Sequence, residues 1–380
     1  MRQNKDLGLL SPSAESESAL GRLRDMSEPE IICEKLGSCG IVTLNRPKAL
    51  NALTLNMVRE MAAALDLWEH DAGVSCVIVQ GVGGKAFCAG GDIRILYDLG
   101  KDGRHAEQLC FWREEYQLNR RIKLYPKPYL ALAGGIVMGG GAGLSLHGSH
   151  VIAGENFTFA MPEAGIGFFP DAGATFFLPR LPSHAGVYLA LTGARMTCGD
   201  ALAFGLARAH VPSARHAALA QRLIGGEVIE AVIEAEKAPA PASALALQRQ
   251  SIERCFSAAT LPVILAKLDD ASQGGSEFAR AAAQAIRRKS PSSLAIALRQ
   301  MQIGDKLDIG DALRTEFRIV SRIARGHDFY EGVRAVIIDK DNRPRWNPAA
   351  MESVESATID SYFAPLLEGE LDFGARTGVP

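Results

Sequence analysis

Short apolar runs alternate with helical patterns from about Ile31 to Val211. Two of these runs flank Gly37 and predict a β-hairpin, and Thr54 suits the N-cap of a helix that continues to about His70. Further strands are predicted at residues 76–80, 129–133, 151–153 and 157–160. Because strands that alternate with helices are typical of the α/β class, we predict an α/β fold for this part of the chain.

The pattern changes at residues 236–246, a connection rich in proline and alanine (EKAPAPASALA). Beyond it, residues 250–330 show long helical periodicities, and only residues 333–338 are predicted as a short strand. The first stretch of the chain, residues 1–26, is polar and lacks a secretory apolar core. We therefore predict a disordered N-terminal tail over residues 1–28, an α/β core over 29–235 and a helical C-terminal module over 236–380.

Composition disfavours several classes of function. The net charge of −2 comes from 41 basic and 43 acidic residues with no basic stripe, so nucleic acid is not an expected partner. The apolar stretches are interrupted well before the ~20 residues that a membrane helix needs, so no membrane contact is expected. Seven cysteines are scattered without a CxxC pair, and eight histidines are dispersed, so we expect no metal centre. Such reduced cysteines, with four acidic residues in the first stretch, predict a cytoplasmic protein.

Common catalytic motifs are absent from the chain. The stretch 83–87 (GGKAF) does not form a phosphate-binding loop, no GxGxxG follows a strand, and neither GxSxG nor HExxH occurs. Nucleotide hydrolysis, dinucleotide redox chemistry and serine-triad hydrolysis are therefore disfavoured.

Two glycine-rich turns are the first candidates for chemistry, at residues 87–92 (FCAGGD) and 138–143 (MGGGAG). Each follows an apolar run and opens a helical segment, although glycine in a helix costs about 1 kcal/mol relative to alanine. Such turns let backbone N–H groups face a ligand, and two of them facing one point would form an oxyanion hole. Taken alone, each turn is also consistent with a tight strand-to-helix connection or with close helix packing.

Two carboxylates follow the glycine turns. Glu163 lies between Pro162 and an apolar, glycine-rich stretch, which would desolvate the carboxylate and raise its pKa, as a general base requires. Asp171 precedes a second glycine-containing turn. Either residue by itself could equally be a helix cap.

As an ordered set, these segments resemble the enoyl-CoA hydratase/isomerase (crotonase) superfamily. The matching stretches are 45–53 (NRPKALNAL), 86–93 (AFCAGGDI), the glycines 139–141, and 161–163 (MPE). The resemblance implies a ββα spiral core that binds an acyl-CoA, whose thioester oxygen is held by the N–H groups of Gly91 and Gly140. It also implies that the adenine and pantetheine of CoA lie along the loop at residues 85–92, with Lys48, Ala89 and Asp92 among the contacts.

The chain departs from the hydratase pattern at two positions, and the first departure weakens the hydratase interpretation. The position of the first glutamate of the hydratases is Gly143, which cannot transfer a proton, and Asp171 stands where hydratases usually have glycine. The second feature resembles the 3-hydroxyisobutyryl-CoA hydrolase branch. Five further stretches share this resemblance: 112–116 (WREEY), 177–181 (FLPRL), 190–193 (ALTG), 325–335 (RGHDFYEGVRA) and 338–348 (IDKDNRPRWNP).

The branch resemblance implies a thioesterase that acts on a short branched 3-hydroxyacyl-CoA, above all 3-hydroxyisobutyryl-CoA of valine catabolism, and that needs no cofactor. Glu163 would attack the thioester carbonyl or deprotonate a water, Asp171 would contact the 3-hydroxyl group and the reacting centre, and Glu115 would bind substrate. The alternatives are an enoyl-CoA hydratase or isomerase, a non-catalytic CoA- or RNA-binding relative, and a structural scaffold. Superfamily members commonly form homo-oligomers, although the C-terminal module could cover the surfaces involved.

Overall fold

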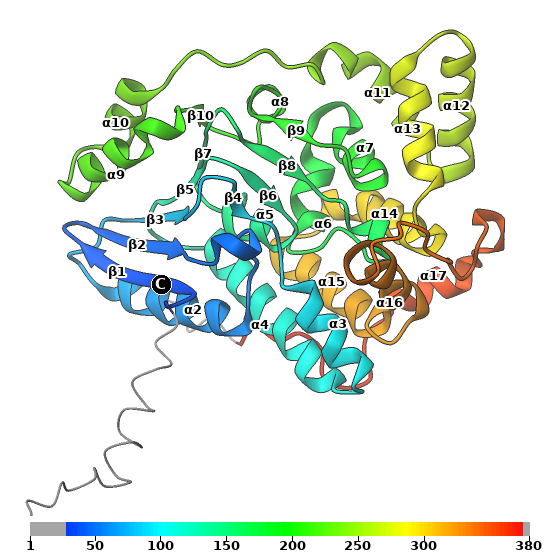
Figure 1. The fold of residues 1–380 in the computed structure, drawn as a ribbon, viewed down its shortest axis with the longest axis horizontal. Helices are drawn as coiled ribbons and strands as arrows, with labels where there is room; N and C mark the ends of the chain where they lie inside the picture. The colour runs from blue at the N-terminus through cyan, green and yellow to red at the C-terminus, as the bar shows by residue number, and fades with distance from the viewer. Residues whose placement is uncertain (1–27, 375–380) are drawn as a thin grey trace, which may run out of the picture.

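The computed structural model describes residues 28–374, so the predicted N-terminal tail, apart from Glu28, lies outside the described residues. A six-stranded sheet has the order β1-β2-β3-β5-β7-β10 (Figure 1). Its strands are β1 (Ile31–Leu36), β2 (Cys39–Leu44), β3 (Cys76–Gly81), β5 (Tyr129–Ala133), β7 (His150–Ala153) and β10 (Ala209–His210). Within this sheet, β1 and β2 pair in the antiparallel sense, as the predicted hairpin around Gly37 requires, and the other neighbouring strands pair in parallel.

The central strands of this sheet are buried on both faces. Along β3, Val77 and Val79 join the main hydrophobic core, whereas Cys76 and Ile78 join a smaller cluster. That cluster is covered by α9 (His216–Ile224) and α10 (Ile229–Glu236). Burial on both faces explains why the strands appear in the sequence as continuous apolar runs without polar alternation.

A second sheet of four short strands has the order β4-β6-β8-β9. These strands are β4 (Ala86–Cys88), β6 (Ile136–Met138), β8 (Thr158–Ala160) and β9 (Met196–Thr197). Successive passes of the chain place one strand in each sheet: β3 then β4, β5 then β6, and β7 then β8. The first two passes end in α3 (Ile93–Lys101) and α5 (Gly140–Ser145), and the third ends in the 3-10 helix η2 (Glu163–Ile166). This path confirms the predicted ββα spiral.

Two long helices cover the main core, and both have clear local determinants. The side chain of Thr54 accepts a hydrogen bond from the Met57 N–H and so caps α2 (Leu55–His70), as predicted. The neighbouring α4 (His105–Lys123) buries Trp112, Tyr116 and Asn119 on its inner face.

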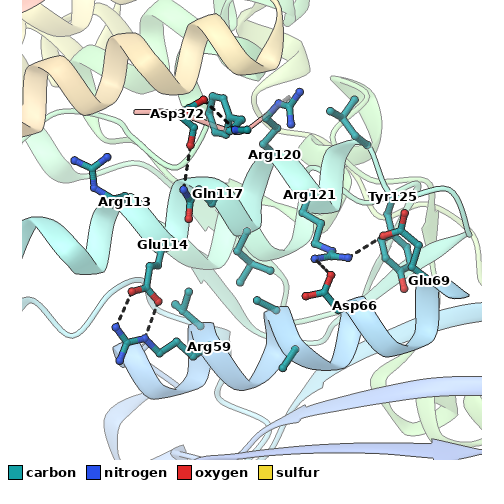
Figure 2. Close-up of a pocket in the computed structure, with 17 residues that line it drawn as sticks. Arg59, Asp66, Glu69, Arg113, Glu114, Gln117, Arg120, Arg121, Tyr125 and Asp372 are labelled. Atoms are coloured by element: carbon teal, nitrogen blue, oxygen red, sulfur yellow. Dashed lines mark hydrogen bonds and ion pairs between the residues drawn. The ribbon is translucent and has the colours of Figure 1, made fainter. Parts of the chain in front are cut away.

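The outer face of α4 borders a groove of about 910 Å³ beside α2 (Figure 2). Five of its charged side chains form ion pairs: Arg59 with Glu114, and Arg121 with Asp66 and Glu69. The carboxylates of these pairs are thus neutralised by arginines, whereas Glu115, on the inner face of α4, is buried with one oxygen that has no hydrogen-bond partner among the described residues.

The region beyond α10 is helical, as expected. Its helices are α11 (Arg249–Phe256), α12 (Leu261–Gln273), α13 (Glu277–Arg287), α14 (Pro291–Ile303), α15 (Ile309–Ile323), α16 (His327–Val333) and α17 (Ser356–Phe363). The connection from α10 to α11 runs along the outside of the molecule (Figure 1). Phe329 of α16 packs against Phe168 with ring centroids 5.5 Å apart, so these helices share the main core with the α/β region. No helix within residues 28–374 is long and apolar enough to cross a membrane.

The predicted strand at residues 333–338 is wrong. The chain there continues from α16 into a π-helical turn, Arg334–Ile338. Short apolar runs do not distinguish strand from buried helix, and here no strand edge is paired with the segment. Arg334 instead binds the carboxylates of Glu331, Asp339 and Asp341, which holds the turn in place.

Candidate active site

The two glycine turns lie side by side because their strands are neighbours. Strand β4 pairs with β6 in parallel, so the carboxyl ends of both strands reach the same edge of the second sheet. Gly90 has φ +111° and Gly139 has φ +48°, which are left-handed conformations that glycine adopts readily. A Cβ atom on Gly90 would lie 3.3 Å from the Met138 carbonyl oxygen and 3.6 Å from the Gly140 nitrogen. The turns are therefore in direct contact.

The N–H groups of Gly91 and Gly140 are free to meet a ligand. Within residues 28–374, neither group donates a hydrogen bond, although the neighbouring Asp92 N–H donates to the Leu53 carbonyl. Gly140 is the first residue of α5, where an N–H has no partner inside the helix. Both glycines line a cavity of about 420 Å³. This arrangement is compatible with an oxyanion hole, which stays a prediction.

Glu163 reaches the same cavity from the third parallel strand. Strand β8 pairs with β6, and Glu163 opens the 3-10 helix that follows it. Its side chain is 7% exposed, and a Cβ on Gly139 would lie 3.2 Å from its Oε1. Burial, and after it the charge of Asp171, raise the pKa of Glu163 well above the ordinary value, while the Lys289 ammonium opposes this rise. The sequence context had predicted this direction.

Asp171 sits in a constrained turn beside Glu163. Ala172 has φ +54° and Gly173 has φ +87°, so two successive residues after Asp171 are left-handed. The Tyr116 hydroxyl donates a hydrogen bond of 2.9 Å to Asp171 Oδ2. Burial raises the pKa of Asp171 to about 7, although the Tyr116 hydrogen bond acts in the opposite direction.

Glu115 approaches the second glycine turn from α4. It is 2% exposed, and its Oε1 is buried with no hydrogen-bond partner within the described part of the chain. A Cβ on Gly140 would lie only 2.2 Å from this oxygen, so the close approach requires glycine at position 140. Burial, followed by the charges of Asp171 and Glu316, raises the pKa of Glu115.

Most of the residues predicted for the site meet here, but two do not. The six that line the cavity are Ala89, Gly91, Glu115, Gly140, Glu163 and Asp171. Lys48 is exposed on the 3-10 helix η1 (Pro47–Ala49), away from this lining. Asp92 caps α3 by accepting the Ile95 N–H, and it forms an ion pair of 3.0 Å with Arg46. The contacts of Lys48 and Asp92 with CoA stay a prediction.

Sequence reasoning missed several residues of the cavity. Lys289, between α13 and α14, lines it beside Glu163, and its Nζ would lie 3.3 Å from a Cβ on Gly165. Val336 and Ile337 of the π-helical turn form part of the wall. No local pattern marked these residues, because they approach the site only through packing of the C-terminal helices. Within residues 28–374, no group of three or more His, Cys, Asp or Glu side chains could hold a metal ion.

Gly143 lacks the space for a second acid at the position expected from hydratases. A Cβ on Gly143 would lie 2.6 Å from Nδ2 of Asn119, and 2.9 Å from its Cγ. Asn119 is fully buried on α4, and neither atom of its amide has a hydrogen-bond partner within the described residues. The Asn119 side chain thus fills the volume that a side chain at position 143 would need.

Comparison with known proteins identifies the class to which this fold and cavity belong. A family model for enoyl-CoA hydratase/isomerase matches residues 39–363, and the chain belongs to this family. It is 44% identical over 356 residues to the mitochondrial 3-hydroxyisobutyryl-CoA hydrolase of Xenopus tropicalis, with 91% of both chains covered. It is 42% identical over 354 residues to the human hydrolase of the same name, covering 90% of this chain and 91% of the other. The resemblance to this branch is confirmed.

Solved structures confirm the fold. A carnitinyl-CoA dehydratase from Mycobacterium thermoresistibile superposes with a TM-score of 0.86 at 38% identity, covering 92% of this chain and 100% of the other. An enoyl-CoA hydratase from Rhodobacter sphaeroides gives 0.83 at 41% identity, with 89% and 98% covered.

The prediction of a cytoplasmic location is wrong, because the hydrolase relatives are mitochondrial proteins. Reduced cysteines report the redox state of a compartment and do not tell which compartment it is. The acidic stretch that had supported the prediction lies within residues 1–27, outside the described residues.

Proposed function

We propose that this protein hydrolyses the thioester of 3-hydroxyisobutyryl-CoA, a short branched 3-hydroxyacyl-CoA, to the free acid and CoA in valine catabolism. The observation that carries the proposal is that Glu163, Asp171, Gly91 and Gly140 line one cavity, where the two glycine amides donate no hydrogen bond to any described residue. The identity of 44% with a hydrolase of this name, over 91% of the chain, supports the same substrate.

The proposed reaction places the thioester oxygen at the N–H groups of Gly91 and Gly140. These groups stabilise the negative charge that develops on the oxygen, and one such donor contributes on the order of 3 kcal/mol to lowering the barrier. The bond from the carbonyl carbon to sulfur breaks, CoA leaves as the thiol after taking up a proton, and a water oxygen completes the acid. No metal or other cofactor takes part, and CoA enters as part of the substrate.

Glu163 has two candidate roles in this scheme. It attacks the carbonyl carbon to give an anhydride that water opens, or it removes the proton of the attacking water. Its buried position beside Gly139 is compatible with both roles. Label from ¹⁸O-water found in the Glu163 side chain after turnover would assign the anhydride route.

Asp171 and Glu115 are proposed to hold the substrate. The Asp171 carboxyl group, held by Tyr116, would bind the 3-hydroxyl group and lie beside the reacting centre. Glu115 has an oxygen next to Gly140 that finds no hydrogen-bond partner in the described part of the chain, and it would contact the acyl portion. The family commonly forms homo-oligomers, and this property stays a prediction for the present chain.

The hydratase alternative is the strongest competitor, since the two solved structures are a dehydratase and a hydratase by name. Addition of water to a double bond needs a matched acid and base. The space beside Gly143 is filled by Asn119, so the second glutamate of hydratases has no room there. This packing favours hydrolysis over hydration.

The test measures thiol release from 3-hydroxyisobutyryl-CoA beside the loss of enoyl absorbance from an enoyl-CoA. We expect thiol release by the wild type, and a decrease in kcat of about 10²- to 10⁴-fold in Glu163→Gln, because a general base typically contributes this much. Glu277→Gln, on the exposed start of α13, is the control and should keep the wild-type rate. Near wild-type turnover by Glu163→Gln, or enoyl hydration without thiol release, would contradict the proposal.

A further inference from the structure

The turn that carries Asp171 depends on contacts from outside the α/β region. Ala172 is a non-glycine residue with φ +54°, and Gly173 follows with φ +87°. A non-glycine residue in the left-handed conformation, such as Ala172, persists only where the surrounding structure holds it. Side chains that contact this turn therefore determine its conformation.

Glu316 provides the most direct contacts. Its side chain extends from α15, is fully buried, and accepts hydrogen bonds from the Gly173 N–H at Oε2 and from the Thr175 N–H at Oε1, both at 2.8 Å. The two oxygens of one carboxylate thus bind the backbone on both sides of the start of α6 (Ala174–Phe177). Hydrogen bonds from N–H groups to a carboxylate are short and strong.

Other contacts complete the support of the turn. Gln300 of α14 donates 2.9 Å and 2.7 Å hydrogen bonds to the Pro170 carbonyl and to the Thr175 hydroxyl. His147 Nε2 lies 2.8 Å from the Ala172 carbonyl oxygen. Glu316, however, is the only one of these three side chains that carries a carboxyl group, and its charge contributes to raising the pKa of Glu115 in the cavity. Burial, and after it the charge of Asp171, raise the pKa of Glu316 itself to about 8.

We infer that Glu316 is a positioning residue: by binding the Gly173 and Thr175 amides, it fixes the turn that directs Asp171 into the cavity. The inference rests on the proposed function, in which Asp171 selects substrates with a 3-hydroxyl group. It makes the helical C-terminal region a determinant of substrate choice, although Glu316 does not line the cavity. Filling the core alone would not require a carboxylate, since a buried charge is costly unless hydrogen bonds compensate it.

The test compares 3-hydroxyisobutyryl-CoA with isobutyryl-CoA, which lacks only the hydroxyl group. Glu316→Gln keeps the size of the side chain but turns an amide NH₂ toward one of the two backbone N–H groups. We expect the ratio of kcat/KM for the two substrates to fall by about 10- to 100-fold, because small displacements of a substrate-positioning group can cost this much. The rate with isobutyryl-CoA should change much less.

Asp200 offers a matched control. Its buried carboxylate accepts the Thr197 and Leu245 N–H groups, each at 2.9 Å, in the same two-oxygen arrangement, but it lies outside the cavity lining. Asp200→Asn should lower the melting temperature as Glu316→Gln does and leave the substrate ratio unchanged. If Glu316→Gln does not fold, Glu316→Asp provides the same comparison with a shorter carboxylate.

A double variant tests whether Glu316 acts through Asp171. In an Asp171→Gly background, Glu316→Gln should produce no further loss in the substrate ratio. Three results would overturn the inference on Glu316 and leave the proposed function standing. They are an unchanged substrate ratio in folded Glu316→Gln, an equal loss of the ratio in Asp200→Asn, and additive effects on the ratio in the double variant. Absence of thiol release by the wild type would instead overturn the proposed function, and this inference with it.

Discussion

Gly143→Ala is expected to have opposite effects on stability depending on the residue at position 119. The added Cβ would lie 2.6 Å from the Asn119 amide nitrogen, whereas ordinary contacts begin at about 3.4 Å, so Asn119 must move by about 0.8 Å. Overpacking of this kind in a core costs about 1–3 kcal/mol. Alanine in place of glycine within helix α5 contributes about 1 kcal/mol in the other direction. The net effect in the wild-type chain is therefore destabilisation by as much as ~2 kcal/mol.

Truncation of Asn119 should reverse the sign of this effect. Neither atom of the Asn119 amide has a hydrogen-bond partner within residues 28–374, so Asn119→Ala removes no such bond and opens the space that position 143 needs. In this background, Gly143→Ala should increase the free energy of unfolding by about 0.5–1 kcal/mol through its helical preference.

The assay is a double-mutant cycle with the wild type, both single variants and the double variant. Chemical denaturation gives the free energies of unfolding, and the coupling between the two positions should be about 1–3 kcal/mol. Melting temperatures provide a second reading, at roughly 1–2 °C per kcal/mol for a chain of 380 residues. Additive effects, or a stabilising Gly143→Ala in the wild-type chain, would refute the argument that Asn119 occupies the place of the second acid.

Two further predictions concern the cavity itself. Lys289→Met removes a cation that favours the ionised form of Glu163, so the pKa of Glu163 should rise and the acid limb of the kcat/KM–pH profile should move to higher pH. Lys289→Arg, which keeps the positive charge, should leave the acid limb where it is in the wild type. An acid limb that does not move in Lys289→Met would show that Lys289 does not affect the ionisation of Glu163. Asp171→Gly should reduce kcat/KM for 3-hydroxyisobutyryl-CoA more than for isobutyryl-CoA, and equal losses would exclude recognition of the hydroxyl group.

Features set by neighbouring residues were predictable from the sequence alone. Strands β3 and β5 appeared as apolar runs because both faces of the sheet are buried, and Thr54 marked the start of α2 because capping is a local interaction. The glycine turns, Glu163 and Asp171 stood in an order that indicated acyl-CoA chemistry, and the structure places them around one cavity.

Tertiary structure decided what depends on packing between distant segments. Residues 333–338 carry an apolar run that suits a strand, yet they form a π-helical turn because they pack at the end of α16 with no strand beside them. Lys289 and Glu316 reach the site from the C-terminal helices, far along the chain from Glu163 and Asp171. Asn119 excludes a second acid only because α4 lies against α5. Such contacts depend on how elements pack in space, and local periodicity does not encode that packing.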